Sequence, residues 1–132
     1  MSRENPMRSK KTDKPGSGRQ ERYLQASILL GLKTRSSYGY ELIGHIQSYG
    51  FIEGDAPPGM IYRHLRQMEE DNLVKSEWET RETGAAKRIY TITDEGKEVL
   101  AVWVRYMANK AKKLNRFVQM YQDTGEPVGG NL

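Results

Sequence analysis

The sequence predicts a mainly α-helical fold that contains one small β-hairpin and ends in a long helix. Three short segments in the first half of the chain repeat apolar residues at steps of three and four. Two β-prone stretches follow, and the helical spacing then continues through residues 94–122. A step of three to four residues is typical of an amphipathic helix, whereas alternation is typical of a strand. We therefore expect one folded unit built from these elements.

The first twenty residues are basic and poor in apolar side chains. They contain six Lys and Arg against two Asp and Glu, and no aromatic residue. A segment of this composition cannot bury enough apolar surface to fold. We expect residues 1–20 to form a disordered basic arm. The arm could add contacts to phosphates, although a solvated tail has the same composition.

Two helices are predicted after the arm. The first begins at Glu21, and its apolar face consists of Leu24, Ile28, Leu29 and Leu32. The second runs from Tyr38 to Tyr49. Ser36 and Ser37 are its candidate N-caps, and Glu41 suits the positive end of the helix dipole.

A third helix is predicted to begin near Gly59 and to run to about Asp71. Pro57 and Pro58 favour an extended entry and then a preset first turn. At about 100° per residue, the buried arc of this helix consists of Ile61, Leu65 and Met68. Its outward face then consists of Gly59, Met60, Tyr62, Arg63, Arg66 and Gln67.

The β-hairpin follows the third helix. Residues 74–80 and 87–92 are β-prone, and the second stretch alternates polar and apolar side chains. Residues 81–86 join them and include Gly84, which favours a turn. We expect two antiparallel strands connected by a loop.

The last predicted helix covers residues 94–122. The hydroxyl of Thr93 can cap it, and Asp94 and Glu95 suit its positive end. Its apolar stripe consists of Leu100, Trp103, Met107, Leu114, Val118 and Tyr121. Residues 123–132 are rich in Gly and turn formers, and we expect a flexible tail.

Three helices followed by a hairpin is the order of a winged helix-turn-helix domain, which we assign to residues 21–93. In such domains the third helix enters the major groove of DNA. Arg63 or Arg66 could pair with guanine, and Tyr62 or Gln67 could bond phosphates. Exposed helices also carry Arg and Gln for solubility, and the acidic end of this helix would repel DNA. Charge alone therefore leaves DNA binding open.

The hairpin carries three further basic residues, Arg81, Lys87 and Arg88. They flank its tip and could reach phosphates or a minor groove beside the third helix. A surface hairpin without a nucleic-acid role would look the same.

Four stretches together resemble the PadR-like transcriptional regulators. They are LLGLK, SYGYELIGHI, PPGMIYRHLRQMEEDNLVKSEWE and GAAKRIYTITDEGKEVLAVW. The similarity extends from Leu24 to about Tyr106, and each stretch is weak evidence when it is taken singly. The resemblance implies a sequence-specific DNA-binding transcriptional regulator that acts as a repressor and forms a homodimer.

The resemblance also implies roles for particular residues. The family's glycine-tyrosine pair falls on Gly39 and Tyr40, and its recognition-helix tyrosine and arginine fall on Tyr62 and Arg63. The basic residues of its wing fall on Lys87 and Arg88. Met60 departs from the small hydroxyl residue that the family often has, which puts a phosphate contact there in doubt.

The single C-terminal helix implies the short subgroup of this family, so that helix would provide most of the dimer contact. Trp103, Met107, Leu114 and Val118 form a stripe with no other partner in a domain this small, and a two-fold interface would cover it. Two recognition helices would then read half-sites of an imperfect palindrome about 34 Å apart. Trp103 could instead stack on a small apolar or aromatic effector, although core packing is the alternative that we favour.

Other functional classes have little support in the sequence. His45 and His64 stand apart without ligand-like spacing, Cys is absent, and no glycine-rich phosphate loop is present. We therefore expect no enzymatic activity, metal or cofactor. The longest apolar run is too short to span a bilayer, and we expect a cytoplasmic protein. A winged-helix adaptor that binds proteins and not DNA remains the alternative.

Overall fold

A computed structural model describes residues 23–49, 57–79 and 87–126. The predicted basic arm, the first two residues of the first predicted helix, the loop between the strands and the last six residues of the tail lie outside these ranges. The chain divides into two compact units, Met1–Leu100 and Ala101–Leu132. The first unit contains all the elements before the final helix.

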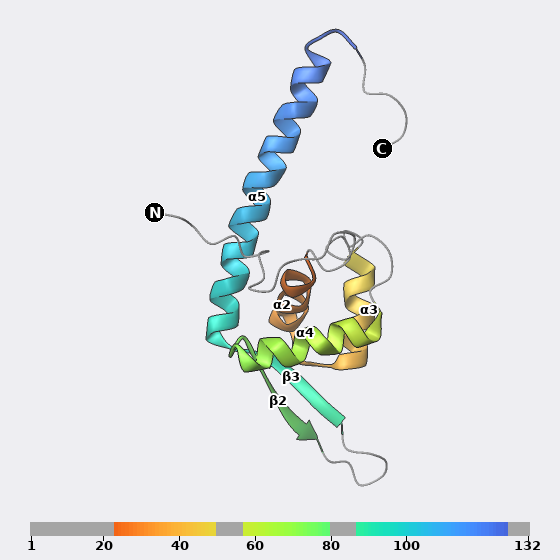
Figure 1. Ribbon diagram of the computed structural model, residues 1–132, viewed down its shortest axis with the longest axis vertical. Coiled ribbons are helices and arrows are strands. Elements are labelled where there is room, and N and C mark those ends of the chain that lie inside the picture. Colours follow the sequence, from red (N-terminus) through yellow and green to blue (C-terminus); the bar gives the residue numbers. More distant parts are fainter. Residues whose placement is uncertain (1–22, 50–56, 80–86, 127–132) are drawn as a thin grey trace. The chain divides into compact units, whose positions relative to one another are not determined.

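Three helices form most of the first unit (Figure 1): α2 (Leu24–Thr34), α3 (Gly39–Tyr49) and α4 (Pro58–Glu70). They contact one another and surround a common core. α2 is the central helix, because seven of its eleven residues are buried. The predicted apolar faces are confirmed, and the largest buried side chains of the three helices are Leu24, Ile28, Leu29, Leu32, Leu42, Ile46, Ile61, Leu65 and Met68.

A short strand that the sequence analysis missed precedes α3. This strand, β1 (Ser37–Tyr38), pairs antiparallel with β3 (Lys87–Ile92), so α3 begins at Gly39 and not at Tyr38. The predicted serine caps are wrong. The Ser36 hydroxyl lies 2.9 Å from that of Thr91, and the Ser37 hydroxyl donates to the Arg35 carbonyl. Pairing to a strand fifty residues away is a tertiary contact, and the local pattern carries no sign of it.

The start of α3 is capped by a side chain from inside the helix. The Tyr38 backbone N–H donates to the carboxylate of Glu41 over 3.0 Å. This is the reciprocal half of a capping box, in which an acidic residue in the first turn satisfies a free backbone donor. Glu41 therefore acts at the predicted end of the helix, through a hydrogen bond as well as through the helix dipole.

The sheet has three strands in the order β1-β3-β2. The predicted hairpin is confirmed, with β2 at Val74–Glu79 and β3 at Lys87–Ile92. The register places Val74 opposite Ile92, Ser76 opposite Tyr90 and Trp78 opposite Arg88. Because residues directly opposite one another share a face, these six side chains lie on one face of the hairpin. The inner end of that face is buried in the core.

The end of α4 and the start of β2 are joined by a tight turn. Asn72 has a φ of 62°, a left-handed conformation that Asn tolerates better than most residues. The N–H of Leu73 donates to the carbonyl of Met68, and the N–H of Asn72 donates to that of Glu69. These two bonds form a Schellman motif, which ends the helix and aims the chain into the strand.

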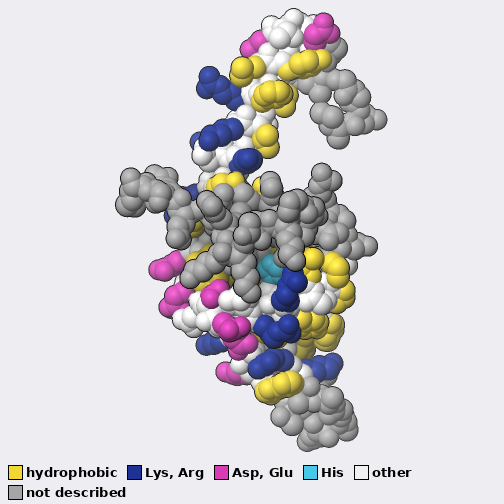
Figure 2. Space-filling model, viewed as in Figure 1, with side chains coloured by type: hydrophobic (Ala, Val, Ile, Leu, Met, Phe, Trp, Pro, Cys, Tyr) yellow, Lys and Arg dark blue, Asp and Glu magenta, His cyan; other side chains and the backbone are white. Residues whose placement is uncertain are grey.

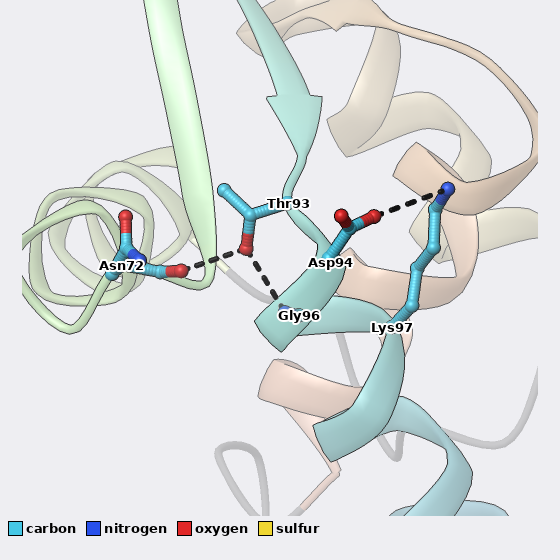
Figure 3. Close-up of polar contacts among 5 residues, drawn as sticks. All are labelled: Asn72, Thr93, Asp94, Gly96 and Lys97. Atoms are coloured by element: carbon cyan, nitrogen blue, oxygen red, sulfur yellow. Dashed lines mark hydrogen bonds and ion pairs between the residues drawn. The ribbon is translucent and has the colours of Figure 1, made fainter.

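The final helix, α5, runs from Asp94 to Gln122, as the sequence predicts. Figure 3 shows how the Thr93 hydroxyl connects two elements: it accepts the N–H of Gly96 over 2.9 Å and donates to the Asn72 carbonyl over 2.7 Å. The predicted cap is thus confirmed. A Cβ on Gly96 would collide with the Leu73 carbonyl oxygen, so this turn of α5 lies directly against the backbone after α4.

In the part of the chain that the structure describes, no helix combines the length and the apolar character needed to cross a membrane.

Candidate nucleic-acid interface

The third helix has the two faces that the sequence predicts. Ile61, Leu65 and Met68 are at most 1% exposed. The opposite side exposes the predicted contact residues Gly59, Tyr62, Arg63, Arg66 and Gln67. Met60 is half-exposed, and its thioether has no hydrogen to donate to a phosphate, so it is a poor candidate for a backbone contact. The exposure of this face is therefore confirmed, and its contact with DNA stays a prediction.

Four of the predicted residues come together in one pocket beside α4. Tyr40, Tyr62, Lys87 and Arg88 line a hollow of about 300 Å³. They come from α3, α4 and β3, which are far apart in the sequence. The remaining lining residues are Tyr38, Gly39 and Tyr90. Among the other predicted residues, Gly59, Arg63, Arg66 and Gln67 remain on the exposed face of α4 and are not part of the lining.

The pocket is walled by aromatic rings and cations. The rings of Tyr38 and Tyr40 are stacked, with centroids 5.7 Å apart and planes within 5°. The ammonium of Lys87 lies 5.6 Å and 5.2 Å from the two centroids. The Tyr38 hydroxyl also donates to the carboxylate of Glu79 on β2. The two stacked rings hold Lys87 by cation–π attraction.

Gly39 is required by the shape of this pocket. A Cβ on Gly39 would lie 2.7 Å from the Tyr62 hydroxyl oxygen and closer still to its ring. The absence of a side chain lets the ring of Tyr62 lie against the first turn of α3. This gives the glycine-tyrosine pair a physical explanation in this chain. Gly39 makes room for the ring of Tyr62, and Tyr40 contributes a second tyrosine ring to the pocket.

Tyr90 closes the inner side of the pocket. It is 5% exposed, and this burial raises the pKa of its hydroxyl above 10.0, although the charge of Arg88 and a hydrogen bond to it act in the opposite direction. The hydroxyl therefore stays protonated at neutral pH. It can contribute a hydrogen-bond donor and no negative charge.

Sequence reasoning missed three residues of this surface: Tyr38, Tyr90 and Trp78. The local pattern places Tyr38 in a helix, and its contact with the pocket depends on the pairing of β1 with β3. The pattern places Tyr90 and Trp78 in the correct strands, but their common face with Arg88 depends on the register. The alternation along the second strand, which puts Tyr90 on the same face as the predicted residue Arg88, is the one signal that could have found Tyr90.

The charge of this surface is local. Residues 21–98 carry ten Lys and Arg against thirteen Asp and Glu, so this part of the chain is acidic overall. Figure 2 shows Lys and Arg side chains in a band over α4 and the hairpin, with acidic side chains gathered to one side of the band. Within residues 21–98, any attraction of a polyanion must therefore come from the band and not from the net charge of this part of the chain.

The second unit contains the C-terminal part of α5 and most of the predicted dimer stripe. Trp103 is only 1% exposed and contacts Tyr106 edge-on, which favours the packing role over the effector role. Our expectation that the whole stripe is uncovered is wrong for this residue. Met107 is half-buried. Leu114 and Val118 are 59% and 40% exposed, and Phe117, which sequence reasoning left out, is 72% exposed.

The two histidines have ordinary surroundings. Nδ1 of His64 lies 3.0 Å from the carbonyl oxygen of Met60 within α4, and His45 is half-buried in α3. No group of three or more potential metal ligands occurs within residues 23–49, 57–79 and 87–126.

The sequence and the fold both match known transcriptional regulators. The model of the transcriptional regulator PadR-like family matches residues 28–102. A Mycobacterium tuberculosis protein named "Probable transcriptional regulator Rv1176c" is 35% identical over 82 residues, which are 61% of this chain and 43% of that protein. This chain thus spans less than half the length of that curated relative.

Solved structures give the same result. A PadR family transcription regulator from Clostridium difficile is 28% identical, with a TM-score of 0.65 over 73% of this chain and 98% of that chain. A PadR-like regulator from Bacillus cereus is 26% identical, with a TM-score of 0.67 over 78% and 98%. PadR of Bacillus subtilis, solved in complex with operator DNA, is 25% identical, with a TM-score of 0.56 over 63% and 47%.

Proposed function

Because the chain belongs to the PadR-like family of transcriptional regulators, we propose that it binds double-stranded DNA in a sequence-specific manner and represses transcription in the cytoplasm. In this proposal α4 is the recognition helix, and the pocket between α3, α4 and β3 holds the DNA backbone. The Bacillus subtilis relative, with its operator DNA, supports the assignment by analogy.

The observation that carries this proposal is the gathering of Tyr40, Tyr62, Lys87 and Arg88 in one pocket beside the exposed face of α4. A phosphate has oxygens that accept hydrogen bonds from tyrosine hydroxyls and charge-assisted bonds from Lys and Arg. Phosphate contacts fix how a protein sits on the duplex, and contacts to base edges select the sequence. The pocket supplies the first kind of contact, and the arginines on the exposed face of α4 supply the second.

We further propose that the protein acts as a homodimer on an imperfect palindrome. The support is the exposed apolar stripe of α5, since a second copy of the same stripe would cover it. Two copies related by a two-fold axis would present two recognition helices to half-sites about one turn of DNA apart. A small apolar or aromatic effector that bound near Leu114 and Val118 would compete with this contact and release the DNA.

The test is the salt dependence of DNA binding. A labelled operator duplex, obtained by selecting bound fragments from a random pool, is titrated at several salt concentrations. We expect log K to fall linearly with log salt, because each neutralised phosphate releases counterions. Weak binding that does not change with salt would instead support the protein-interaction adaptor, for which the acidic net charge of residues 21–98 is an argument.

Arginine variants of α4 test the assignment of the recognition face. Arg63→Ala and Arg66→Ala should each weaken operator binding by about 1 to 3 kcal/mol and relax the sequence preference, if each pairs with a base. Lys75→Ala is the matched control, since Lys75 is an exposed cation on the opposite face of the hairpin. Unchanged operator affinity in both arginine variants would refute the recognition face.

A further inference from the structure

A large aromatic side chain lies in water near the outer end of the hairpin. Trp78 on β2 is 62% exposed, and the fold makes no use of most of its surface. The guanidinium carbon of Arg88 lies 5.1 Å from the centre of its ring, and the two residues stand directly opposite each other in the register. Trp78 and Arg88 therefore form a cross-strand pair.

This pair lies on the α4 side of the hairpin. Ser76 and Tyr90 occupy the preceding rung of the same face. The Ser76 hydroxyl donates to the carboxylate of Glu69 on α4 over 2.8 Å, and Tyr90 lines the pocket together with Tyr62 of α4. Two residues along a strand advance by about 7 Å. Arg88 itself lines the pocket. The Trp78–Arg88 pair thus extends the candidate interface from the pocket to the next rung of the hairpin.

Each residue of the pair suits a different part of the DNA backbone: Arg88 suits the phosphate, and the Trp78 indole suits the deoxyribose. A guanidinium that lies over an indole ring is held in place by cation–π attraction. Arg88 also bonds to the Tyr90 side chain, and a guanidinium has five N–H donors, so further donors remain for a phosphate. The exposed part of the indole is a flat apolar surface, and the apolar group beside a phosphate in DNA is the deoxyribose.

We propose that Trp78 is a direct DNA contact of the hairpin: its indole packs on a deoxyribose of the backbone and aims Arg88 at the adjoining phosphate. The proposal rests on the proposed function, because it assumes that the face with α4 binds the duplex. Trp78 has no charge, so a search for basic residues does not find this contact.

Fluorescence tests the contact directly. The chain has two tryptophans, Trp78 and Trp103, and Trp103 is 1% exposed. Acrylamide should therefore quench mainly Trp78 in the free protein. A saturating amount of a short unlabelled duplex should lower the quenching constant by about half or more, since the indole becomes covered. Trp78→Phe protein should show weak quenching that the duplex does not change.

Affinity tests the role of the pair. Trp78→Ala should weaken duplex binding by about five- to tenfold, in line with the loss of one aromatic contact. The salt slope should fall by less than in Arg88→Ala, which removes a cation. The double variant should lose less than the product of the two single effects, because each residue depends on the other. Lys75→Ala on the opposite face should have a smaller effect than either.

The outcomes separate this inference from the proposed function. If anisotropy shows a protein–DNA complex in which Trp78 is quenched as readily as before, Trp78 does not touch DNA, and the proposed function stands. If no duplex binds at low salt, the proposed function itself fails. If a poly-glutamate peptide protects Trp78 and the duplex does not, the pair recognises an acidic protein, and the inference is overturned.

Discussion

Gly39 and Tyr62 together determine the shape of the candidate DNA pocket. Gly39 is buried at the first position of α3, and Tyr62 lies across it from α4. Tyr62 is still 36% exposed, so its ring could swing outward without breaking the core. The position of this tyrosine is therefore sensitive to a change that would leave the fold intact.

We predict that Gly39→Ala weakens DNA binding while the protein stays folded. The added methyl group should force the Tyr62 ring out of the pocket, and the loss of its proposed hydrogen bond to a phosphate should cost about 1 to 2 kcal/mol. Anisotropy with a labelled operator duplex measures the loss. Circular dichroism should give a melting curve close to that of the wild type.

Gly44→Ala is the matched control in the same helix. Nothing lies within 4 Å of a Cβ at Gly44. Its affinity for DNA should be unchanged, and its stability should rise by up to about 1 kcal/mol, because alanine is the better helix former. Equal loss of affinity in the two variants would show that Gly39 acts through the helix and not through Tyr62.

At the scale of elements, the connection between α4, β2 and α5 depends on Thr93 and Asn72. Asn72 ends α4 in a left-handed conformation, and its carbonyl accepts the Thr93 hydroxyl. The Asn72 side chain also donates to the carboxylate of Glu95 over 2.8 Å. The end of one helix and the start of another are thus joined by hydrogen bonds among three residues, Asn72, Thr93 and Glu95. This network fixes α4, and with it the exposed arginines, relative to the hairpin.

We predict that Thr93→Ala lowers the free energy of unfolding by about 1 to 2 kcal/mol, because it removes the cap of α5. It also removes the hydrogen bond to Asn72. Denaturation in urea measures the change. Thr93→Ser keeps the hydroxyl and should recover most of the loss. A serine variant as unstable as the alanine variant would assign the effect to the lost methyl group instead.

At the scale of the whole molecule, charge is divided between segments of the chain. Between Glu98 and Asp123 there are five Lys and Arg and no acidic residue, so α5 is basic over most of its length. The same helix exposes Leu114, Phe117 and Val118. A proposed dimer through α5 therefore gains from apolar burial and loses from repulsion between like charges.

We predict that Leu114→Ala combined with Phe117→Ala produces monomers with reduced affinity for the operator. Both side chains are exposed, so the fold should survive and only the contact between copies should weaken. Sedimentation measures the oligomeric state. Gln119→Ala is the control, since Gln119 is exposed but lies about 140° around the helix from Leu114 and about 160° from Phe117. A double variant that sediments as a dimer would contradict the proposed interface.

Salt should act in opposite directions on the two associations. Added salt screens the repulsion between two basic helices, so the dimer should become tighter as ionic strength rises. Binding to DNA should become weaker, because the release of counterions is less favourable at higher salt. Sedimentation at low and high salt checks the first expectation. A dimer that dissociates as salt rises would show that ion pairs, and not the apolar stripe, hold it together.

The sequence by itself determined the helices, the hairpin strands and the two faces of α4. Apolar spacing and local capping specify such elements, so the spacing alone places Ile61, Leu65 and Met68 inward and Arg63 and Arg66 outward. Local pattern cannot show how distant segments meet. Only the tertiary structure decided that β1 pairs with β3, that Gly39 makes room for Tyr62, and that Trp103 is buried. The register of the hairpin likewise decided that Trp78 shares a face with Arg88, because side chains alternate across a sheet and a shift of one residue would send Trp78 to the other side.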